Sequence, residues 1–226
     1  MTCWLYDTCS HVDCEKGFCL KKYKLEQLYE ASLLSEKQRK HLALYPDSDG
    51  TDIDIFKKLA GISKDIVRFV DEGGNLFLYS DNCGCGKTSW AIRMIQTYFN
   101  QIWVRSDLTC RALFVHVPSF LNALKASISA PNEYADYILQ NIETADIIVW
   151  DDIADKIGSE YDLNKLLSFI DRRIALGKTN IYTSNIHGRK LVEALGERLA
   201  SRIERFSISL EFKGGDKRSY AVKGVN

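Results

Sequence analysis

A short turn after an apolar run holds the residues with the clearest capacity for chemistry. Residues 75–88 read NLFLYSDNCGCGKT, and an amphipathic segment follows directly. The residues that fit the pattern G-x-x-x-x-G-K-[ST] are Gly84, Gly86, Lys87 and Thr88. In such a loop, backbone N–H groups of the turn and of the first helical turn point at the β- and γ-phosphates of a nucleotide. Asp81 stands where the pattern has its first glycine, and we expect its carboxylate to point away from the phosphates.

Two side chains of this loop suit a nucleotide with its metal. The compact charge of Lys87 on a flexible stem suits the β- and γ-phosphates, and the Thr88 hydroxyl suits Mg²⁺. ATP and Mg²⁺ are therefore the expected cofactors. The loop residues expected at the nucleotide are Gly84, Cys85, Gly86, Lys87, Thr88 and Ser89. A surface turn before a helix is the alternative interpretation.

An apolar run that ends in two acids comes one β–α unit later. Residues 145–152, ADIIVWDD, are typical of a Walker B strand. Asp151 is expected to hold Mg²⁺, usually through water, and Asp152 to orient and deprotonate the attacking water. A strand that ends in a polar turn is common, so the order of the two motifs adds weight to this interpretation. The intervening strand, residues 113–117, is typical of the ATPase branch in which an extra strand separates the two nucleotide motifs.

A further strand, residues 181–184, delivers Asn185 to its carboxyl end. Ligands bind at that edge in open α/β sheets, so Asn185 can hold the lytic water beside Asp152. An Asn that simply forms a turn is the alternative, because Asn is common after strands.

Three arginines then lie on one face of a predicted helix, at spacings of four and three residues. They are Arg198, Arg202 and Arg205. One interpretation is a solvated or salt-bridged surface. The other is an arginine finger that crosses a subunit boundary to stabilise charge on the transferring phosphate. The spacing does not select one of the three.

The order of apolar and amphipathic segments predicts an α/β fold with a five-stranded parallel sheet covered by helices on both faces. The expected strands are about 75–80, 112–117, 146–151, 179–184 and 206–212, and the expected helices between them are about 87–101, 118–129, 133–145, 162–176 and 188–205. Before the sheet we expect a helix over 20–45, broken near 32–35, and another over 53–70. The acidic turn at 46–50 is the expected linker, dividing an N-terminal unit (1–50) from the main domain (51–226).

Composition limits the function classes. The 226 residues, 46% apolar and 27% charged, suit one α/β domain and a small extra unit. Thirty basic and thirty acidic residues leave no net charge, so any nucleic-acid contact must come from a local patch. No apolar run approaches the ~18 residues of a membrane span, and the N-terminus does not resemble a signal peptide. We therefore expect a cytoplasmic protein with no membrane contact.

Four of the seven cysteines crowd the first twenty residues, where no helical or strand period is visible. In a chain with no export signal, such a cluster favours a metal over disulfides. The expected Zn²⁺ ligands are Cys3, Cys9, Cys14 and Cys19, with His11 as the substitute. Metal binding would supply folding energy that so short a unit cannot obtain from apolar burial. Free or iron-bound thiols are the alternative.

These motifs together resemble one family. The series Gly84-Cys-Gly-Lys-Thr, Asp151-Asp152, Thr183-Ser184-Asn185 and Gly196-Glu-Arg-Leu-Ala-Ser-Arg202 resembles the DnaC/DnaI-type replicative helicase loaders, which are AAA+ ATPases. The cysteine cluster followed by KKYKLEQLY resembles the short zinc-containing front end of loaders carried by phages of low-GC Gram-positive bacteria. The resemblance covers essentially the whole chain.

The resemblance implies further roles. It implies that Arg202 is the trans-acting arginine finger, that Arg218 is the sensor 2 arginine at the nucleotide, and that the chain lacks a C-terminal lid domain. It implies that the front end grips the helicase. It also implies that single-stranded DNA lies inside the ATPase ring, against a helical insertion that matches residues 118–145. Lys125 is the only cation in that stretch, so it is the candidate DNA contact. With a single cation, the insertion alone is not expected to bind DNA strongly by electrostatic attraction.

The combined expectation is an ATPase that binds the bacterial hexameric replicative helicase and helps place it on single-stranded DNA. It would self-assemble through its ATPase subunit boundaries, and its hydrolysis would be slow and dependent on assembly. A transposase helper ATPase has the same core and a different partner. A binding adaptor, in which nucleotide fixes a conformation but is hardly hydrolysed, stays open because of Asp81 and the short Asp152. A small nucleotide kinase explains neither Asn185 nor the cysteines.

Overall fold

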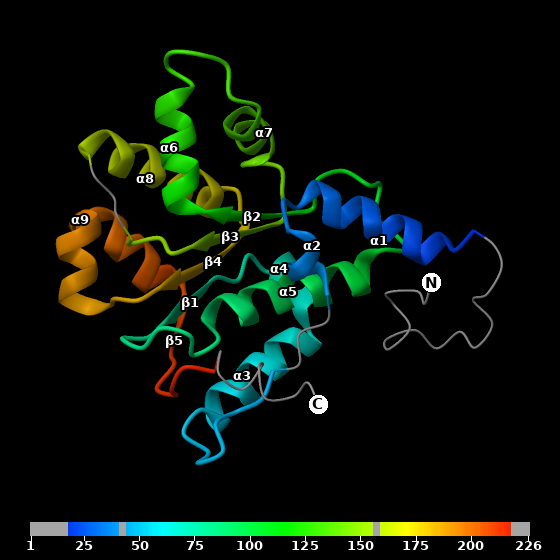
Figure 1. Cartoon of the computed structure of the whole chain (residues 1–226), viewed down its shortest axis with the longest axis horizontal. Coiled ribbons are helices and arrows are strands. Elements are labelled where there is room, and N and C mark those ends of the chain that lie inside the picture. The colour runs from blue at the N-terminus through cyan, green and yellow to red at the C-terminus, as the bar shows by residue number, and fades with distance from the viewer. Residues whose placement is uncertain (1–17, 41–43, 156–158, 218–226) are drawn as a thin grey trace.

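The structure, a computed structural model, describes residues 18–40, 44–155 and 159–217 (Figure 1). The predictions for Cys3, Cys9, His11, Cys14 and Arg218 lie outside the described residues. Among the helices described, none combines the length with the apolar character that crossing a bilayer requires.

A five-stranded sheet forms the centre of the fold, and all its strand pairs are parallel. Its strands are β1 (Leu76–Tyr79), β2 (Ala112–His116), β3 (Ile147–Asp151), β4 (Thr179–Ser184) and β5 (Ile208–Glu211). All five were predicted. Their order is β2-β3-β4-β1-β5. Along the chain β2 comes between β1 and β3, as predicted. In the sheet, β4 separates β1 from β3, and β2 lies at the edge.

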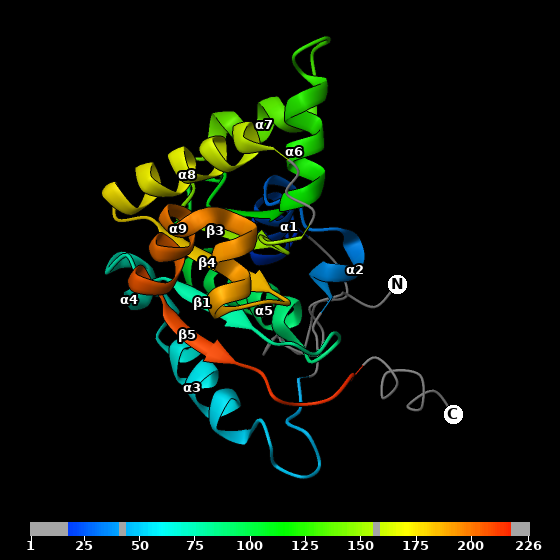
Figure 2. The same cartoon turned by 90° about the vertical axis from the view of Figure 1, so that its left-hand side faces the viewer.

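Helices cover both faces of the sheet (Figures 1 and 2). One layer contains α1 (Leu20–Ala31), α2 (Glu36–Arg39), α3 (Ile53–Lys64), α4 (Ile66–Asp71) and α5 (Lys87–Ile102). The other contains α6 (Val117–Ala126), α7 (Glu133–Asn141), α8 (Glu160–Ala175) and α9 (Gly188–Phe206). Successive strand residues point to opposite faces, so Leu76 and Leu78 enter the first core while Phe77 enters the second. Burial on both faces explains why β1, β2 and most of β3 are continuous apolar runs.

Two predicted helices are interrupted. The segment predicted as one helix over 53–70 breaks at Asp65, whose φ of −107° and ψ of 33° lie outside helical values, and Ile66 then begins α4 fully buried. Gly196 interrupts α9 with a φ of 74° and a ψ of 158°. Only glycine reaches such a conformation without steric cost, so this residue fixes the direction of the second half of α9, which carries the three arginines.

The N-terminal helix belongs to the first core. Leu25 and Leu28 of α1 are completely buried there, and the Ser32 carbonyl accepts a 2.9 Å hydrogen bond from the Phe114 N–H of β2. The helix ends near Ser32, as the sequence predicts. The domain boundary near residue 50 stays a prediction, but residues 20–34 pack against the same sheet as the rest of the chain.

A buried polar group of three side chains, which we call the amino-end cluster, closes the amino ends of the strands. It consists of Asn75, Arg173 and Asn180, each less than a tenth exposed. The Asn75 carboxamide oxygen accepts hydrogen bonds from the backbone and side-chain amides of Asn180, at 2.7 and 2.9 Å. The Arg173 guanidinium donates to the Asn180 side chain at 2.8 Å and to four backbone carbonyls, those of Ile142, Ala145, Asp146 and Thr179. Burial lowers the pKa of Arg173 to about 10.

Candidate active site

The predicted phosphate loop connects β1 to α5 at the carboxyl edge of the sheet. Gly86 precedes the first helical residue with a φ of 107°, and Gly84 has a φ of 75°. Both values lie in the left-handed region that glycine adopts freely, so the sequence supplies glycine where the turn requires it. The Trp90 N–H then donates to the Gly86 carbonyl at 2.9 Å and starts the helix. The loop therefore ends at a helix N-terminus, which favours a bound anion.

The Lys87 ammonium lies under this loop, with the residue only 5% exposed. It donates a hydrogen bond to the Asn82 carbonyl at 3.0 Å and lies 3.5 Å from the Cys85 sulfur. The Lys87 ammonium has three protons to donate, and among the described residues the Asn82 carbonyl is the one oxygen that accepts a hydrogen bond from it. The side chain is held in place with donor capacity left for a ligand.

Asp151, at the end of β3, meets the loop directly. Its Oδ1 accepts hydrogen bonds from the Thr88 hydroxyl at 2.8 Å and from the Thr183 hydroxyl of β4 at 2.7 Å. Burial raises the pKa of the Asp151 carboxyl above its usual range, and these two hydrogen bonds oppose the rise. Among the described residues, both hydrogen bonds to this carboxylate go to Oδ1, which leaves Oδ2 for a cation. A hydroxyl and a carboxylate are the hard oxygen ligands that Mg²⁺ prefers, so the residues fit the predicted metal.

Asp152 occupies a constrained position beside this pair. Its φ is 53°, its N–H donates to the Thr183 hydroxyl at 2.9 Å, and its side chain is 32% exposed. The His116 Nε2 lies 3.8 Å from Asp152 Oδ2, while the Nδ1 of the same ring lies 2.8 Å from the Ser119 hydroxyl. The backbone turn thus presents the Asp152 carboxylate at the open edge, with an imidazole next to it.

Sequence reasoning did not single out His116, and it quoted Thr183 only as part of a motif, without a role at the site. The signal was present, because His116 ends β2 in register with Asp151, and Thr183 lies just before the predicted Asn185. Asn185 directly follows β4 and is exposed at the same edge. We call Lys87, Thr88, Asp151, Asp152 and Thr183 the carboxyl-end site. The neighbouring strands β3 and β4 and the start of α5 bring it together.

Asp81 lies at the outer side of the loop. Its carboxylate is 61% exposed and lies 3.8 Å from the His187 Nε2, at the start of α9. The His187 ring lies 4.6 Å from the Tyr79 ring. The Asp81 carboxylate therefore contacts the start of α9, whereas the Lys87 ammonium contacts Asn82 and Cys85.

The three arginines share one surface, as the sequence predicts. Arg198, Arg202 and Arg205 line one hollow with Leu167, Glu197 and Ser201. Arg202 forms an ion pair with Asp171 of α8, and its guanidinium lies 5.7 Å from the centre of the Phe206 ring. Arg198 and Arg205 are exposed. The assignment of a finger to Arg202 stays a prediction.

Two other predicted site residues have contacts within the fold. The Lys125 ammonium lies 2.7 Å from the Asp162 carboxylate, which is 1% exposed, and so links α6 to α8. The Cys19 sulfur accepts a hydrogen bond from the Lys22 N–H at 3.5 Å and caps α1. Within the described part of the chain, no group of three or more His, Cys, Asp or Glu side chains could hold a metal ion.

Comparison with known proteins identifies the fold. No protein-family model matches the sequence, and no curated protein matches it. The crystal structure of the DnaC helicase loader matches with a TM-score of 0.61 and 17% identity, covering 83% of this chain and 99% of that one. The DnaI crystal structure matches with a TM-score of 0.62 and 19% identity, covering 80% and 96%. The replication initiator DnaA, bound to AMPPCP and single-stranded DNA, matches with a TM-score of 0.59 and 17% identity, covering 81% and 52%.

The chain shares the fold of the DnaC and DnaI structures. In this fold the predicted phosphate loop follows β1, the paired acids lie at the end of β3, and Asn185 follows β4. All three lie at the carboxyl edge of one parallel sheet, the edge at which open α/β sheets bind their ligands.

Proposed function

We propose that this chain is an ATP-dependent loader of a bacterial hexameric replicative helicase, active on single-stranded DNA in the cytoplasm. The observation that carries the proposal is the 2.8 Å hydrogen bond between Thr88 of the phosphate loop and Asp151 of β3, in a fold shared with the DnaC and DnaI structures. A surface turn before a helix would not require a buried carboxylate to meet its first hydroxyl. The DnaA structure bound to AMPPCP and single-stranded DNA supports both ligands for this fold.

The carboxyl-end site would bind ATP and hydrolyse it. Lys87 and the backbone of residues 84–89 would hold the phosphates, while Thr88 and Asp151 would hold Mg²⁺. A bound Mg²⁺ neutralises phosphate charge. Asp152 would take the proton of the attacking water, and Asn185 would hold that water. The His116 ring, 3.8 Å from the Asp152 carboxylate, would restrict how that base can turn.

Hydrolysis would depend on self-assembly, with Arg202 of one subunit completing the site of the next. We expect Arg202→Ala to leave ATP affinity nearly unchanged and to abolish the turnover that assembly stimulates. Steady-state ATPase measured against protein concentration checks this. Arg198→Ala and Arg205→Ala are matched controls from the same hollow. Unchanged turnover in Arg202→Ala, with loss in one control, would move the finger to that residue.

Residues 1–50 would form the unit that binds the helicase, and residues 51–226 the ATPase domain. Cys3, Cys9, Cys14 and Cys19, or His11 in place of one of them, would hold Zn²⁺. Elemental analysis of protein purified without chelator is expected to give about one Zn per chain. A well-folded N-terminal unit without metal would contradict this.

Single-stranded DNA would pass the insertion formed by α6 and α7, with Lys125 as its cation. The Asp162 carboxylate already pairs with this lysine, so its contribution to DNA affinity would be small. Arg218, which follows the described residues, would reach the nucleotide as sensor 2.

Co-purification with a purified bacterial replicative helicase tests the loader proposal. We expect the full-length chain to bind the helicase and the helicase to be transferred to single-stranded DNA with ATP present. ATPase activity is then measured with and without helicase and DNA. Binding to the helicase without turnover in any condition would favour the nucleotide-gated adaptor. No binding to the helicase would favour the transposase helper ATPase.

A further inference from the structure

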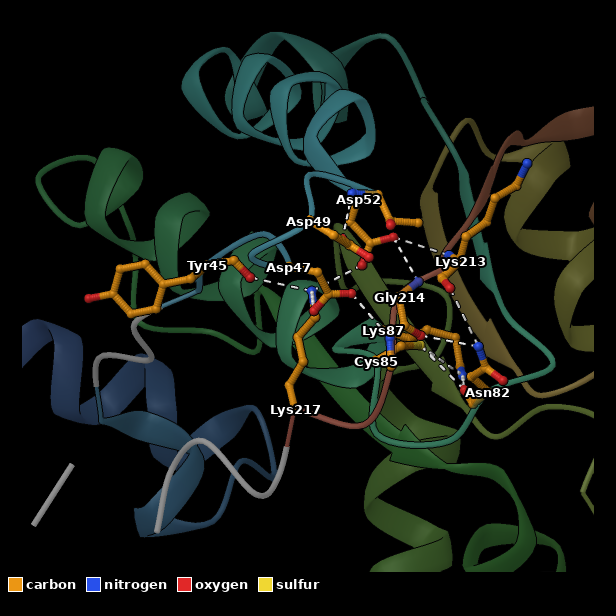
Figure 3. A network of polar contacts seen from close by, with 12 residues as sticks. Tyr45, Asp47, Asp49, Asp52, Asn82, Cys85, Lys87, Lys213, Gly214 and Lys217 are labelled. Atoms are coloured by element: carbon orange, nitrogen blue, oxygen red, sulfur yellow. Dashed lines mark hydrogen bonds and ion pairs between the residues drawn. The ribbon is translucent and has the colours of Figure 1, made fainter. Parts of the chain in front are cut away.

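The segment 213–217, beyond β5, lies on the phosphate loop (Figure 3). The Asn82 side-chain amide donates to the Gly214 carbonyl at 3.2 Å, and the Lys217 N–H donates to the Gly84 carbonyl at 3.0 Å. The Asp216 carboxylate lies against Gly84 so closely that a Cβ on Gly84 would lie 2.0 Å from its Oδ1. Glycine at position 84 therefore allows the close approach of the segment 213–217 as well as the left-handed turn of the loop.

A buried carboxylate that lies about 160 residues earlier in the sequence, that of Asp52, holds this segment. Asp52, at the start of α3, is completely buried, and its Oδ1 accepts hydrogen bonds from the Lys213 N–H at 3.1 Å and the Gly214 N–H at 3.0 Å. Asp47 accepts one from the Gly215 N–H at 3.1 Å. Gly214 has no room for a side chain here, because a Cβ would lie 1.9 Å from the Asp47 carboxylate.

Lys217 closes the same arrangement from its own side chain. Its ammonium lies 3.0 Å from Asp52 and 3.4 Å from Asp47, donates to the Tyr45 carbonyl at 3.3 Å, and lies 4.5 Å from the centre of the Phe56 ring. The lysine side chain is only 18% exposed. The three charged side chains converge in Figure 3 between the segment 44–52 and the phosphate loop.

We propose that Asp47, Asp52 and Lys217 form a clasp that positions the phosphate loop. The clasp holds residues 213–217 against Asn82 and Gly84, and so fixes the loop in the geometry that receives the phosphates. This inference rests on the proposed binding of ATP at that loop. It makes the acidic turn at 46–50, expected as a linker, part of the support of the nucleotide site.

The physical basis is the cost of a flexible loop. If a loop becomes ordered only when its ligand binds, the lost conformational entropy weakens the binding. A loop that is already ordered in the free protein avoids this cost. Removing one member of a buried ion pair leaves the other charge uncompensated and releases what the pair held. Loss of the Lys217 cation therefore leaves Asp47 and Asp52 without their counter-charge and loosens the end of the segment at residue 217, where the N–H bonds to Gly84.

The test is titration of a fluorescent ATP analogue with Mg²⁺ into the full-length chain and its Lys217→Met variant. Methionine keeps the apolar stem and removes the charge. We expect affinity to fall about tenfold, with partial recovery in Lys217→Arg. Asp52→Asn is expected to weaken binding similarly, and the double variant to be no weaker than the single ones, because both remove one interaction. Lys22→Met, which removes a lysine–carboxylate pair at 3.7 Å on α1, is the matched control and should bind as the wild type does.

Amide hydrogen exchange of the ligand-free proteins separates positioning from a general loss of stability. We expect faster exchange in Lys217→Met at residues 82–88 and 213–217 together, with α8 unchanged. If Lys217→Met and Asp52→Asn both bind the ATP analogue as tightly as the wild type does, the clasp is overturned and the ATPase proposal still stands. An exchange rate that rises throughout the chain would also overturn it, because the residues would then support the whole fold.

A wild-type protein that binds no ATP analogue would instead reject the proposed ATP dependence. Should Asp52→Asn fail to fold, Lys217→Met and Lys217→Arg still give the result, since Lys217 lies at the outer end of the segment.

Discussion

The two polar groups at opposite ends of the sheet are built from similar materials and differ in how completely they are satisfied. In the amino-end cluster, Arg173 donates to five oxygens and Asn75 uses both its oxygen and its amide. In the carboxyl-end site, as far as the described residues show, Lys87 donates to one oxygen and to the Cys85 sulfur, and Asp151 accepts two hydrogen bonds on a single oxygen. A saturated cluster stabilises the fold, whereas an incompletely bonded one keeps capacity for a ligand.

This contrast predicts opposite effects of removing the two buried cations. Arg173→Leu should lower the free energy of unfolding by about 3–5 kcal/mol, because buried carbonyls lose their donors. Affinity for ATP in the remaining folded protein should not change. Chemical denaturation followed by circular dichroism measures the first quantity. The neighbouring Arg172 is the control, since its side chain is 61% exposed in a pair with Glu143, and Arg172→Leu should cost under about 1 kcal/mol. Equal effects of the two variants would contradict the comparison.

Lys87→Met should do the reverse. We expect ATP affinity to fall by about 100-fold, because a charge-assisted contact to phosphate is lost. The melting temperature without nucleotide should stay the same or rise, since a buried ammonium with few partners costs free energy to desolvate. Calorimetry with and without ATP measures both. A large fall in stability would show that this lysine is structural after all.

Asp151 offers a pH-dependent form of the same comparison. Burial raises its pKa in the folded protein, so the folded state binds the proton more tightly than the unfolded state, and the stability contributed by protonation is lost as pH rises through the raised value. Asp151→Asn resembles the protonated carboxyl. It should therefore raise the melting temperature at neutral pH, with a gain that shrinks toward acid pH, and it should remove the effect of Mg²⁺ on ATP affinity. The exposed Asp155→Asn is the control, and a gain independent of pH would contradict the assignment.

The smallest effect is expected at Asp81. Its carboxylate is exposed and near His187, so salt screens its repulsion of phosphate, and Asp81→Gly should change ATP affinity by less than about threefold. A strong tightening would mean that the native loop is kept weak, which would favour the adaptor over the loader. Fluorescence titration at low and high salt checks this.

Most of the fold could be predicted because its signals are local. The apolar runs give the five strands, and the loop glycines give the turn before α5. The contacts that complete the site join residues far apart in sequence, as when Lys217 meets Asp52, 165 residues away. The burial of Arg173 could be inferred from the sequence, since it follows Leu166 and Ile170 at helical spacing on the apolar face of α8. An arginine there indicates a buried cation, but its carbonyl acceptors come from other elements.

The break of α9 at Gly196 also follows from a local signal that was not used. Glycine inside a helical pattern lowers helix propensity, and the sequence has Gly196 directly before the arginines. The break at Asp65 has no such signal in residue type. Ile66, the first residue after this break, is completely buried, which only the folded chain shows.

The burial of α1 has a practical consequence for anyone who wishes to study the ATPase part alone. A fragment starting at residue 51 would lose Leu25, Leu28, Tyr29 and Leu34, all at most 2% exposed, and would uncover the apolar surface beneath them. Such a surface promotes aggregation. A fragment starting just before α1, at residue 18, keeps this cover while removing most of the cysteine cluster, and should be the better choice for soluble expression.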